Sequence, residues 1–212
     1  MIPHMKLFVT ETEKHLQIDE FHANNIADLR IYWQNIRDKY MGYDADFCYH
    51  GEHVSHIPEE FLSEIGAEIL ESCIETRLFQ KNFIPTDKLD LIPVDEANFA
   101  SFALLHDKVQ GMYWTSERLK KDLTPWLIYM YGDSYVLMRL GKGEFAEIYA
   151  LEAADMHVKK ALLSQAAEYA FKMNKANVLW QIDDDAHADL ELSQALGFEV
   201  CGTYVAYSVL IV

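Results

Sequence analysis

One acidic residue stands inside an otherwise apolar run, where its type and position suit proton transfer. Glu147 lies within the β-like run 145–151, whose period-two alternation places Tyr149 and Leu151 on its face and Glu152 on the opposite one. A carboxylate so placed can take a proton from a bound ammonium group, directly or through water. A solvated acid on a strand face gives the same pattern. Glu147 is therefore a candidate general base, weighed against an ordinary surface carboxylate.

A second group of side chains, which could act as metal ligands, lies in the segment 48–56, with the sequence CYHGEHVSH. His50, His53 and His56 recur there at three-residue spacing, beside a cysteine and a glutamate. Zn²⁺ accepts these ligand types in tetrahedral geometry. Spacing alone is weak evidence, because no second ligand group with partner spacing follows. The preferred interpretation is a polar loop, and no metal site is predicted; the sequence leaves open whether the three histidines bind a metal.

The charge balance limits the classes of partner. The chain of 212 residues has 34 acidic and 18 basic side chains, a formal net charge of −16. Such a surface repels phosphate backbones, which disfavours nucleic acid, and it suits a cationic partner such as an amine, although solubility alone also accounts for it. Three cysteines without a C-x-x-C spacing do not indicate a disulfide framework. Without a signal-like or membrane-spanning apolar run, we expect a soluble, cytoplasmic protein with no membrane partner.

The sequence is similar to itself at a spacing of 131 residues. Residues 45–49 lie beside 176–180, and 66–69 beside 197–200, without an internal gap. The apolar stripe of one helix also matches that of another: Ile31, Ile36 and Tyr40 lie beside Leu162, Ala167 and Phe171. Two unrelated helix–strand units of similar length would match in part, but the ungapped register favours a duplication. It predicts a truncated copy at 1–83 and a full copy at 88–212.

The full copy is predicted to have the order β-α-α-β-β-β-α-β-α-β, with a final hairpin as an alternative. Asp95 and Thr115 or Ser116 are suitable N-caps for the first two helices, and Gly197 can end the last one. Strands are expected at 89–94, 126–130, 135–140, 145–151, 178–182 and from 198 onward, and helices at 95–109, 116–123, 156–173 and 188–196. Since strand and helix faces both need covering, this is a mixed sheet with helices on both sides.

This order resembles the N-acetyltransferase (GNAT) superfamily, and three short segments are similar to it locally. Residues 196–198 (LGF) resemble the family's ending before its last strands. Residues 145–151 resemble its central strand, and residues 161–163 (ALL) resemble part of the helix after the acyl-CoA loop. The resemblance covers 88–212, and through the repeat its second half covers 1–83. It implies an α/β (α+β) fold with a mixed, mostly antiparallel sheet flanked by helices.

The family's phosphate-binding pattern is eroded in this chain. The family has an arginine or glutamine and then two small residues before the ALL helix, so that backbone N–H groups can approach the pyrophosphate. Ala154, His157 and Lys159 stand at these places. Lys159 and Lys160 can hold a phosphate as point charges, although solvated lysines on an exposed first turn are the more ordinary interpretation. The place of the family's tyrosine general acid holds Ser193.

The resemblance implies an N-acetyltransferase that moves an acetyl group from acetyl-CoA to a small-molecule or peptide amine. In that hypothesis Glu147 is the catalytic base. The backbone of Ala150 and Leu151 binds the thioester carbonyl, and Lys159 and Lys160 bind the phosphates of the cofactor.

The alternative is a non-catalytic GNAT-like binding or interaction protein that has lost the pyrophosphate site. The missing small residues and the absent tyrosine favour it. Trp114 and Trp126 can line a substrate cleft, though aromatic residues in such places usually belong to a core. The sequence does not determine the substrate, and a homodimer is compatible with it.

Overall fold

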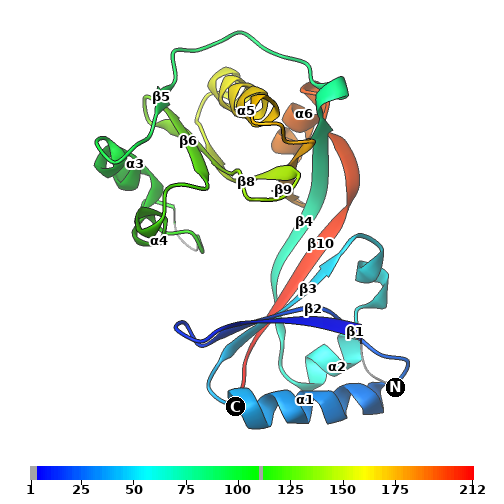
Figure 1. The fold of residues 1–212 in the computed structure, drawn as a ribbon. Helices are drawn as coiled ribbons and strands as arrows, with labels where there is room; N and C mark the ends of the chain where they lie inside the picture. The colour runs from blue at the N-terminus through cyan, green and yellow to red at the C-terminus, as the bar shows by residue number, and fades with distance from the viewer. Residues whose placement is uncertain (1–3, 110–111) are drawn as a thin grey trace. The chain divides into compact units, whose positions relative to one another are not determined.

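The computed structural model describes residues 4–109 and 112–212, which form two compact units (Figure 1). The first unit comprises the chain up to Glu75, Ile182–Asp185 and Cys201–Val212, and the second comprises Thr76–Gln181 and Ala186–Val200. Strands β4 (Glu68–Phe79) and β10 (Glu199–Leu210) contribute to both. The copies predicted at 1–83 and 88–212 are a hypothesis about duplication of the sequence. The two units are defined by spatial proximity, so they do not test that hypothesis.

The second unit holds a mixed sheet in the order β4-β9-β8-β7-β6-β5. The pairs from β5 to β8 are antiparallel, and β8 and β9 are parallel. Its elements in chain order are η2 (Gln80–Asn82), β5 (Ile92–Pro93), α3 (Phe99–His106), α4 (Ser116–Lys121), β6 (Trp126–Tyr131), β7 (Ser134–Arg139), β8 (Phe145–Glu152), α5 (Met156–Lys172), β9 (Asn177–Asp183) and α6 (His187–Ala195).

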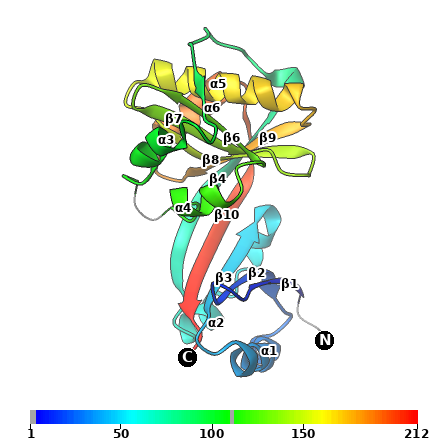
Figure 2. The same cartoon turned by 60° about the vertical axis from the view of Figure 1, so that its left-hand side comes forward.

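Helices cover both faces of this sheet (Figure 2). The apolar side of α5 packs against β6, β7 and β8, with Ala161, Leu162 and Ala166 fully buried. Helices α3 and α4 pack on the opposite face, where Phe102 and Leu119 meet alternate residues of the strands. The predicted fold class, a mostly antiparallel mixed sheet flanked by helices, is confirmed.

The first unit has a sheet in the order β1-β2-β3-β10, with β2 and β3 parallel and the other pairs antiparallel. Helices α1 and α2 bury Trp33, Ile36 and Phe61 against one face of it, where they meet Ile18 and Phe47. Its elements are β1 (His4–Thr10), β2 (His15–His22), α1 (Ile26–Tyr40), β3 (Asp44–His50), the 3₁₀ helix η1 (Gly51–His56) and α2 (Glu59–Glu64).

Apart from the 3₁₀ helix η1, the elements from β1 to β4 recur in the same order from β7 to β10. Strands β4 and β10 have the same length of 12 residues and begin at Glu68 and Glu199, which are 131 positions apart. Helices α2 and α6 are both followed by a glycine with positive φ, Gly66 and Gly197. The correspondence between the halves therefore extends from residues to whole elements.

Several local predictions differ from the structure. The strand predicted at 89–94 is reduced to Ile92–Pro93. The first helix begins at Phe99 and not just after Asp95, because the Asp95 carboxylate accepts hydrogen bonds from the backbone of Ala97 and Asn98 and closes a turn there. Ile31, predicted in the apolar stripe, is 61% exposed. Of the two endings that the sequence left open, the structure has the single strand, β10, and not the hairpin.

Candidate functional site

Strands β8 and β9 stop pairing before either strand ends. Their parallel ladder runs from the pair Phe145–Asn177 to the pair Ile148–Trp180, whereas β8 continues to Glu152. On the β9 side, the backbone of Ala150 and Leu151 therefore lies beyond the parallel ladder. Both side chains are buried, so the backbone is the part of these two residues that is placed to meet a ligand.

A β-bulge coincides with the end of this ladder. On the β7 side, Leu137 pairs with Ala150 but Met138 pairs with Ile148, which leaves Tyr149 as the extra residue. A bulge at this place bends β8, and a bend is what allows two parallel neighbours to diverge.

The bulge also corrects the predicted faces of β8. Residues 135, 137 and 139 of β7 share one face, and their partners on β8 are Glu152, Ala150 and Glu147 respectively. Glu152 therefore lies on the same face as Glu147, and Leu151, paired with Val136, lies on the other. The sequence prediction was the reverse, because an uninterrupted period of two was assumed across Tyr149.

Glu147 lies in a network of charged and aromatic side chains. It is half-buried and pairs across the strands with Arg139. Burial raises the pKa of the Tyr149 phenol, and the charge and hydrogen bond of Glu147 raise it further, while Arg139 opposes them. The Arg139 guanidinium lies 5.5 Å from the ring centre of Trp114 and 5.9 Å from that of Trp126. Both indoles lie edge-on to Tyr149 and pack against the core cluster of Phe102 and Leu119, so a role in lining a substrate cleft stays a prediction.

A buried histidine holds the Trp114 segment in place. His106 is 1% exposed, and its Nε2 lies 2.6 Å from the carbonyl oxygen of Trp114 and its Nδ1 lies 3.0 Å from the Tyr135 hydroxyl. A carbonyl only accepts, so Nε2–H donates to it, and in the neutral imidazole Nδ1 is then the acceptor for the Tyr135 hydroxyl. Sequence reasoning missed this histidine, because it follows the apolar stripe of a helix. Arg139 was also missed, although the short 141–143 turn already placed it opposite the strand of Glu147.

The start of α5 carries a negative cap where the family binds pyrophosphate. One oxygen of the Asp155 carboxylate accepts hydrogen bonds from the backbone N–H of His157, at 2.8 Å, and of Val158, at 3.1 Å. These are N–H groups of the kind that hold a phosphate at a helix N-terminus. The Asp155 carboxylate therefore occupies these two N–H groups, and its negative charge would repel an incoming phosphate.

The two predicted phosphate-binding lysines have different surroundings. Lys159, in the first turn of α5, places its ammonium 2.5 Å and 2.7 Å from the two carboxylate oxygens of Asp189 on α6, with only 14% of its side chain exposed. Lys160 lies with His157 beside a hollow of about 450 Å³ whose other wall is residues 85–87. Ser193 is buried, and its hydroxyl donates to the carbonyl of Leu190, so it supplies no exposed acid.

This unit therefore suits the acyl arm of acetyl-CoA better than its pyrophosphate. The bulged, diverging end of β8 can take the acyl arm along the backbone of Ala150 and Leu151. At the helix start, the Asp155 cap opposes the pyrophosphate, and Lys159 is already neutralised by Asp189.

Comparison with known proteins identifies the fold. Models of protein families give no match to this sequence, and neither do curated protein sequences. Among solved structures, the chain is similar to a GCN5-related N-acetyltransferase from Sphaerobacter thermophilus, with a TM-score of 0.67 and 11% identity over 99% of this chain and 77% of that one. It is also similar to a GCN5-related N-acetyltransferase from Kribbella flavida, with a TM-score of 0.64 and 13% identity over 98% and 87%.

A third similar structure is a tandem GNAT protein from the clavulanic acid biosynthesis pathway. Its TM-score is 0.64, with 11% identity over 100% of this chain and 79% of that one. At such identities the similarity establishes the fold, and this chain has the GNAT fold. Within its described residues, no helix combines the length and apolar character that crossing a bilayer requires.

Proposed function

We propose that this protein is an N-acetyltransferase that transfers an acetyl group from acetyl-CoA to a small-molecule or peptide amine. The observation that carries the proposal is the place of Glu147, which pairs with Leu179 one residue before the last pair of the β8–β9 ladder and two residues before the bulge at Tyr149. The cofactor, when bound, supplies the activated thioester. Glu147 is a half-buried carboxylate beside this end of the ladder. It can accept the proton that the substrate ammonium must lose before the amine attacks the thioester.

In this proposal the residues of the chain have separate roles. Glu147 accepts the proton of the substrate ammonium, directly or through water. Trp114 and Trp126 border the amine and limit its contact with water. The backbone of Ala150 and Leu151 binds the acyl arm of the cofactor, and Lys160 contributes positive charge near the phosphates. The net charge of −16 favours the approach of a cationic substrate.

The second candidate is a non-catalytic binding or interaction protein. It is supported by the Asp155 cap and by the ion pair between Lys159 and Asp189, which together weaken the place where a pyrophosphate would bind. Both candidates agree on the fold, so they are separated by a measurement of cofactor binding and not by further comparison.

We expect purified protein to bind acetyl-CoA with a dissociation constant in the micromolar range, because the acyl arm and the adenosine group contribute beyond the phosphates. Isothermal titration calorimetry with acetyl-CoA, and with coenzyme A as the comparison for the acyl group, measures this directly. Micromolar binding would justify a screen of amine substrates. Absence of binding up to millimolar acetyl-CoA would contradict the acetyltransferase proposal and leave the binding protein.

The Asp155 cap gives a specific prediction for cofactor affinity. Asp155→Asn keeps a side-chain oxygen that caps the helix nearly as well, but it removes the negative charge. We expect acetyl-CoA to bind about fivefold more tightly, which corresponds to about 1 kcal/mol for a screened charge pair near a protein surface. Asp133→Asn, an exposed acid in the turn between β6 and β7, is the matched control. Equal affinity of the Asp155 variant and wild type would show that the phosphates do not lie at this helix start.

We also propose that the two halves arose by duplication, with a truncated copy at 1–83 and a full copy at 88–212. Two observations support this. Six elements recur in one order, and β4 and β10 have the same length and begin 131 positions apart. In the first half, the positions that correspond to the start of α5 also lack the glycines of the family pattern. Asp28 and Leu29 stand at the places of Lys159 and Lys160, so the first copy lacks the positive charges as well and is not expected to bind a second cofactor.

A further inference from the structure

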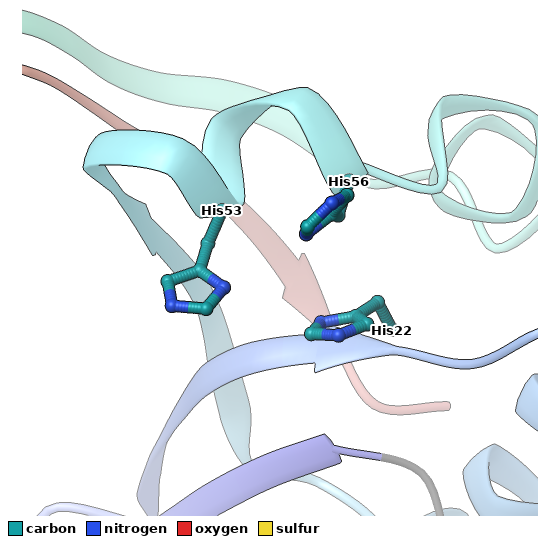
Figure 3. Close-up of side chains that lie close together, drawn as sticks. All are labelled: His22, His53 and His56. Atoms are coloured by element: carbon teal, nitrogen blue, oxygen red, sulfur yellow. The ribbon is translucent and has the colours of Figure 1, made fainter.

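Three histidines of the first unit converge on one small volume (Figure 3). His22 comes from the end of β2, and His53 and His56 come from η1. One ring nitrogen of each lies within 4.8 Å of the others. The rings of His22 and His56 have centres 5.2 Å apart, and those of His53 and His56 are 6.0 Å apart.

The backbone explains why these three side chains meet. Residues three apart in a 3₁₀ helix lie on the same side, so η1 presents His53 and His56 together. The parallel ladder between β2 and β3 ends at the pair Asp19–Cys48, so the end of β2 and the turn after β3 flank the place where these strands separate. His22 is therefore brought to η1 by the divergence of two parallel strands, although it lies about 30 positions away in the sequence.

Two of the ring nitrogens are buried without a partner. Nδ1 of His22 and Nδ1 of His53 are shielded from solvent, and among the described residues neither has a hydrogen-bond partner. Buried polar atoms in folded proteins are almost always satisfied, so two such atoms in one group of three imidazoles call for a ligand. A cation that accepts imidazole lone pairs satisfies both at once.

The carboxylate behind His53 completes the pattern of a metal ligand. Oε1 of Glu20 lies 3.6 Å from Nε2 of His53, and the Glu20 side chain is 15% exposed. A metal-binding histidine usually directs its second ring nitrogen to a carboxylate, which fixes the ring orientation and the tautomer. With Nε2 facing Glu20, His53 directs the unpartnered Nδ1 to the other two imidazoles.

We propose that His22, His53 and His56 bind one Zn²⁺ ion in the first unit. Three imidazole ligands leave the fourth tetrahedral position for water. Zn–N bonds of about 2.0–2.1 Å place two ligand nitrogens about 3.3 Å apart in a tetrahedral site, so nitrogens that now lie within 4.8 Å of one another must approach by up to about 1.5 Å. His56 is exposed and His53 half-buried on a short helix, which leaves their side chains room for that rotation.

The composition of this group differs from the one that the sequence suggested. His50 is directed elsewhere: its Nδ1 lies 3.3 Å from Oε1 of Glu75, and its ring packs against Tyr204. His22 takes the place that spacing alone had given to His50. The bound ion would join the end of β2 to η1 and so stabilise this part of the first unit.

A second group of possible ligands in the same unit, Glu71, Cys73 and Asp183, is less suited to the ion. Burial raises the pKa of the Cys73 thiol, and the carboxylates of Glu71 and Asp183 raise it further. The thiol donates to Oε1 of Glu71 at 3.3 Å. Because the thiolate is the form that binds metals, a thiol held protonated by two acids is a poor ligand.

Zinc titration of tag-free, chelator-treated full-length protein tests the proposal. We expect one Zn²⁺ per chain with a dissociation constant at or below the micromolar range. His56→Ala, which changes an exposed residue, should weaken binding at least tenfold, and His22→Gln should do the same. His187→Ala removes the exposed histidine 131 positions after His56, and Asp183→Asn disables the second group; both should bind Zn²⁺ within twofold of wild type.

Two further readouts do not depend on any activity. Co²⁺ in place of Zn²⁺ should give the intense visible absorption of a tetrahedral site, and Zn²⁺ should raise the melting temperature of wild type but not of His56→Ala. No saturable binding below about 100 μM Zn²⁺ would overturn the proposal at the affinities typical of a metal site. Unchanged binding by His56→Ala, or loss of binding by Asp183→Asn, would overturn it as well.

Discussion

Glu147→Gln is expected to lower the rate constant kcat for acetyl transfer by about 10²–10⁴-fold, the usual contribution of a general base. The substitution keeps the size of the side chain but removes its ability to accept a proton from the substrate ammonium. The neighbouring Arg139, Trp114 and Trp126 would remain, so binding of the amine should change much less than kcat. The effect should therefore fall on kcat and leave KM within a few-fold of wild type.

Initial-rate kinetics with the amine found by screening, over a range of pH, measures this effect. Glu144→Gln is the matched control, since it makes the same chemical change at an exposed residue just before β8 and should leave the rate unaltered. Titration with acetyl-CoA separates the base from the cofactor site, because its affinity should be equal in both variants and wild type. A Glu147→Gln enzyme with nearly normal kcat would show that another group, or water alone, takes the proton.

Much of the fold was predictable from local chemistry. Alternating apolar residues located the strands β6 to β9 to within two residues, and the stripe of α5 located that helix. The Thr115 side chain caps α4 by accepting from the backbone of Arg118, as its type suggested. The helix start predicted at Asp95 was wrong, because the same side chain that can cap a helix can also close a turn, and only the downstream backbone decides between them.

The candidate site was less predictable, because its decisive features are not local. Glu147 was identified as an acid in an apolar strand, but the bulge at Tyr149 has no residue signature in the sequence and changed which side chains share its face. The pairing of Lys159 with Asp189 joins two helices and depends on how they pack. His22 likewise meets His53 and His56 only because β2 and β3 diverge.

Gly197→Ala is expected to destabilise the second unit by at least about 4 kcal/mol, among the largest effects of a single substitution. Gly197 follows α6 with φ of +96°. Its N–H donates to the carbonyl of Gln194 and the next N–H, of Phe198, donates to that of Ser193, the two bonds of a Schellman ending. A Cβ at Gly197 would lie 1.9 Å from the backbone oxygen of Asn82. Backbone must therefore move, since no side-chain rotation relieves that overlap.

The chain supplies a control that separates this overlap from the cost of positive φ. Gly66 ends α2 with the same pair of hydrogen bonds and φ of +74°, but a Cβ there meets no atom within 4 Å. Gly66→Ala should cost about 1–2 kcal/mol, the price of left-handed backbone alone. Gly132→Ala, at φ of +57° in open space within the second unit, should cost the same. Thermal and urea unfolding followed by circular dichroism measure all three. A Gly197 variant no less stable than the other two would mean that the 80–84 segment does not pack against the end of α6.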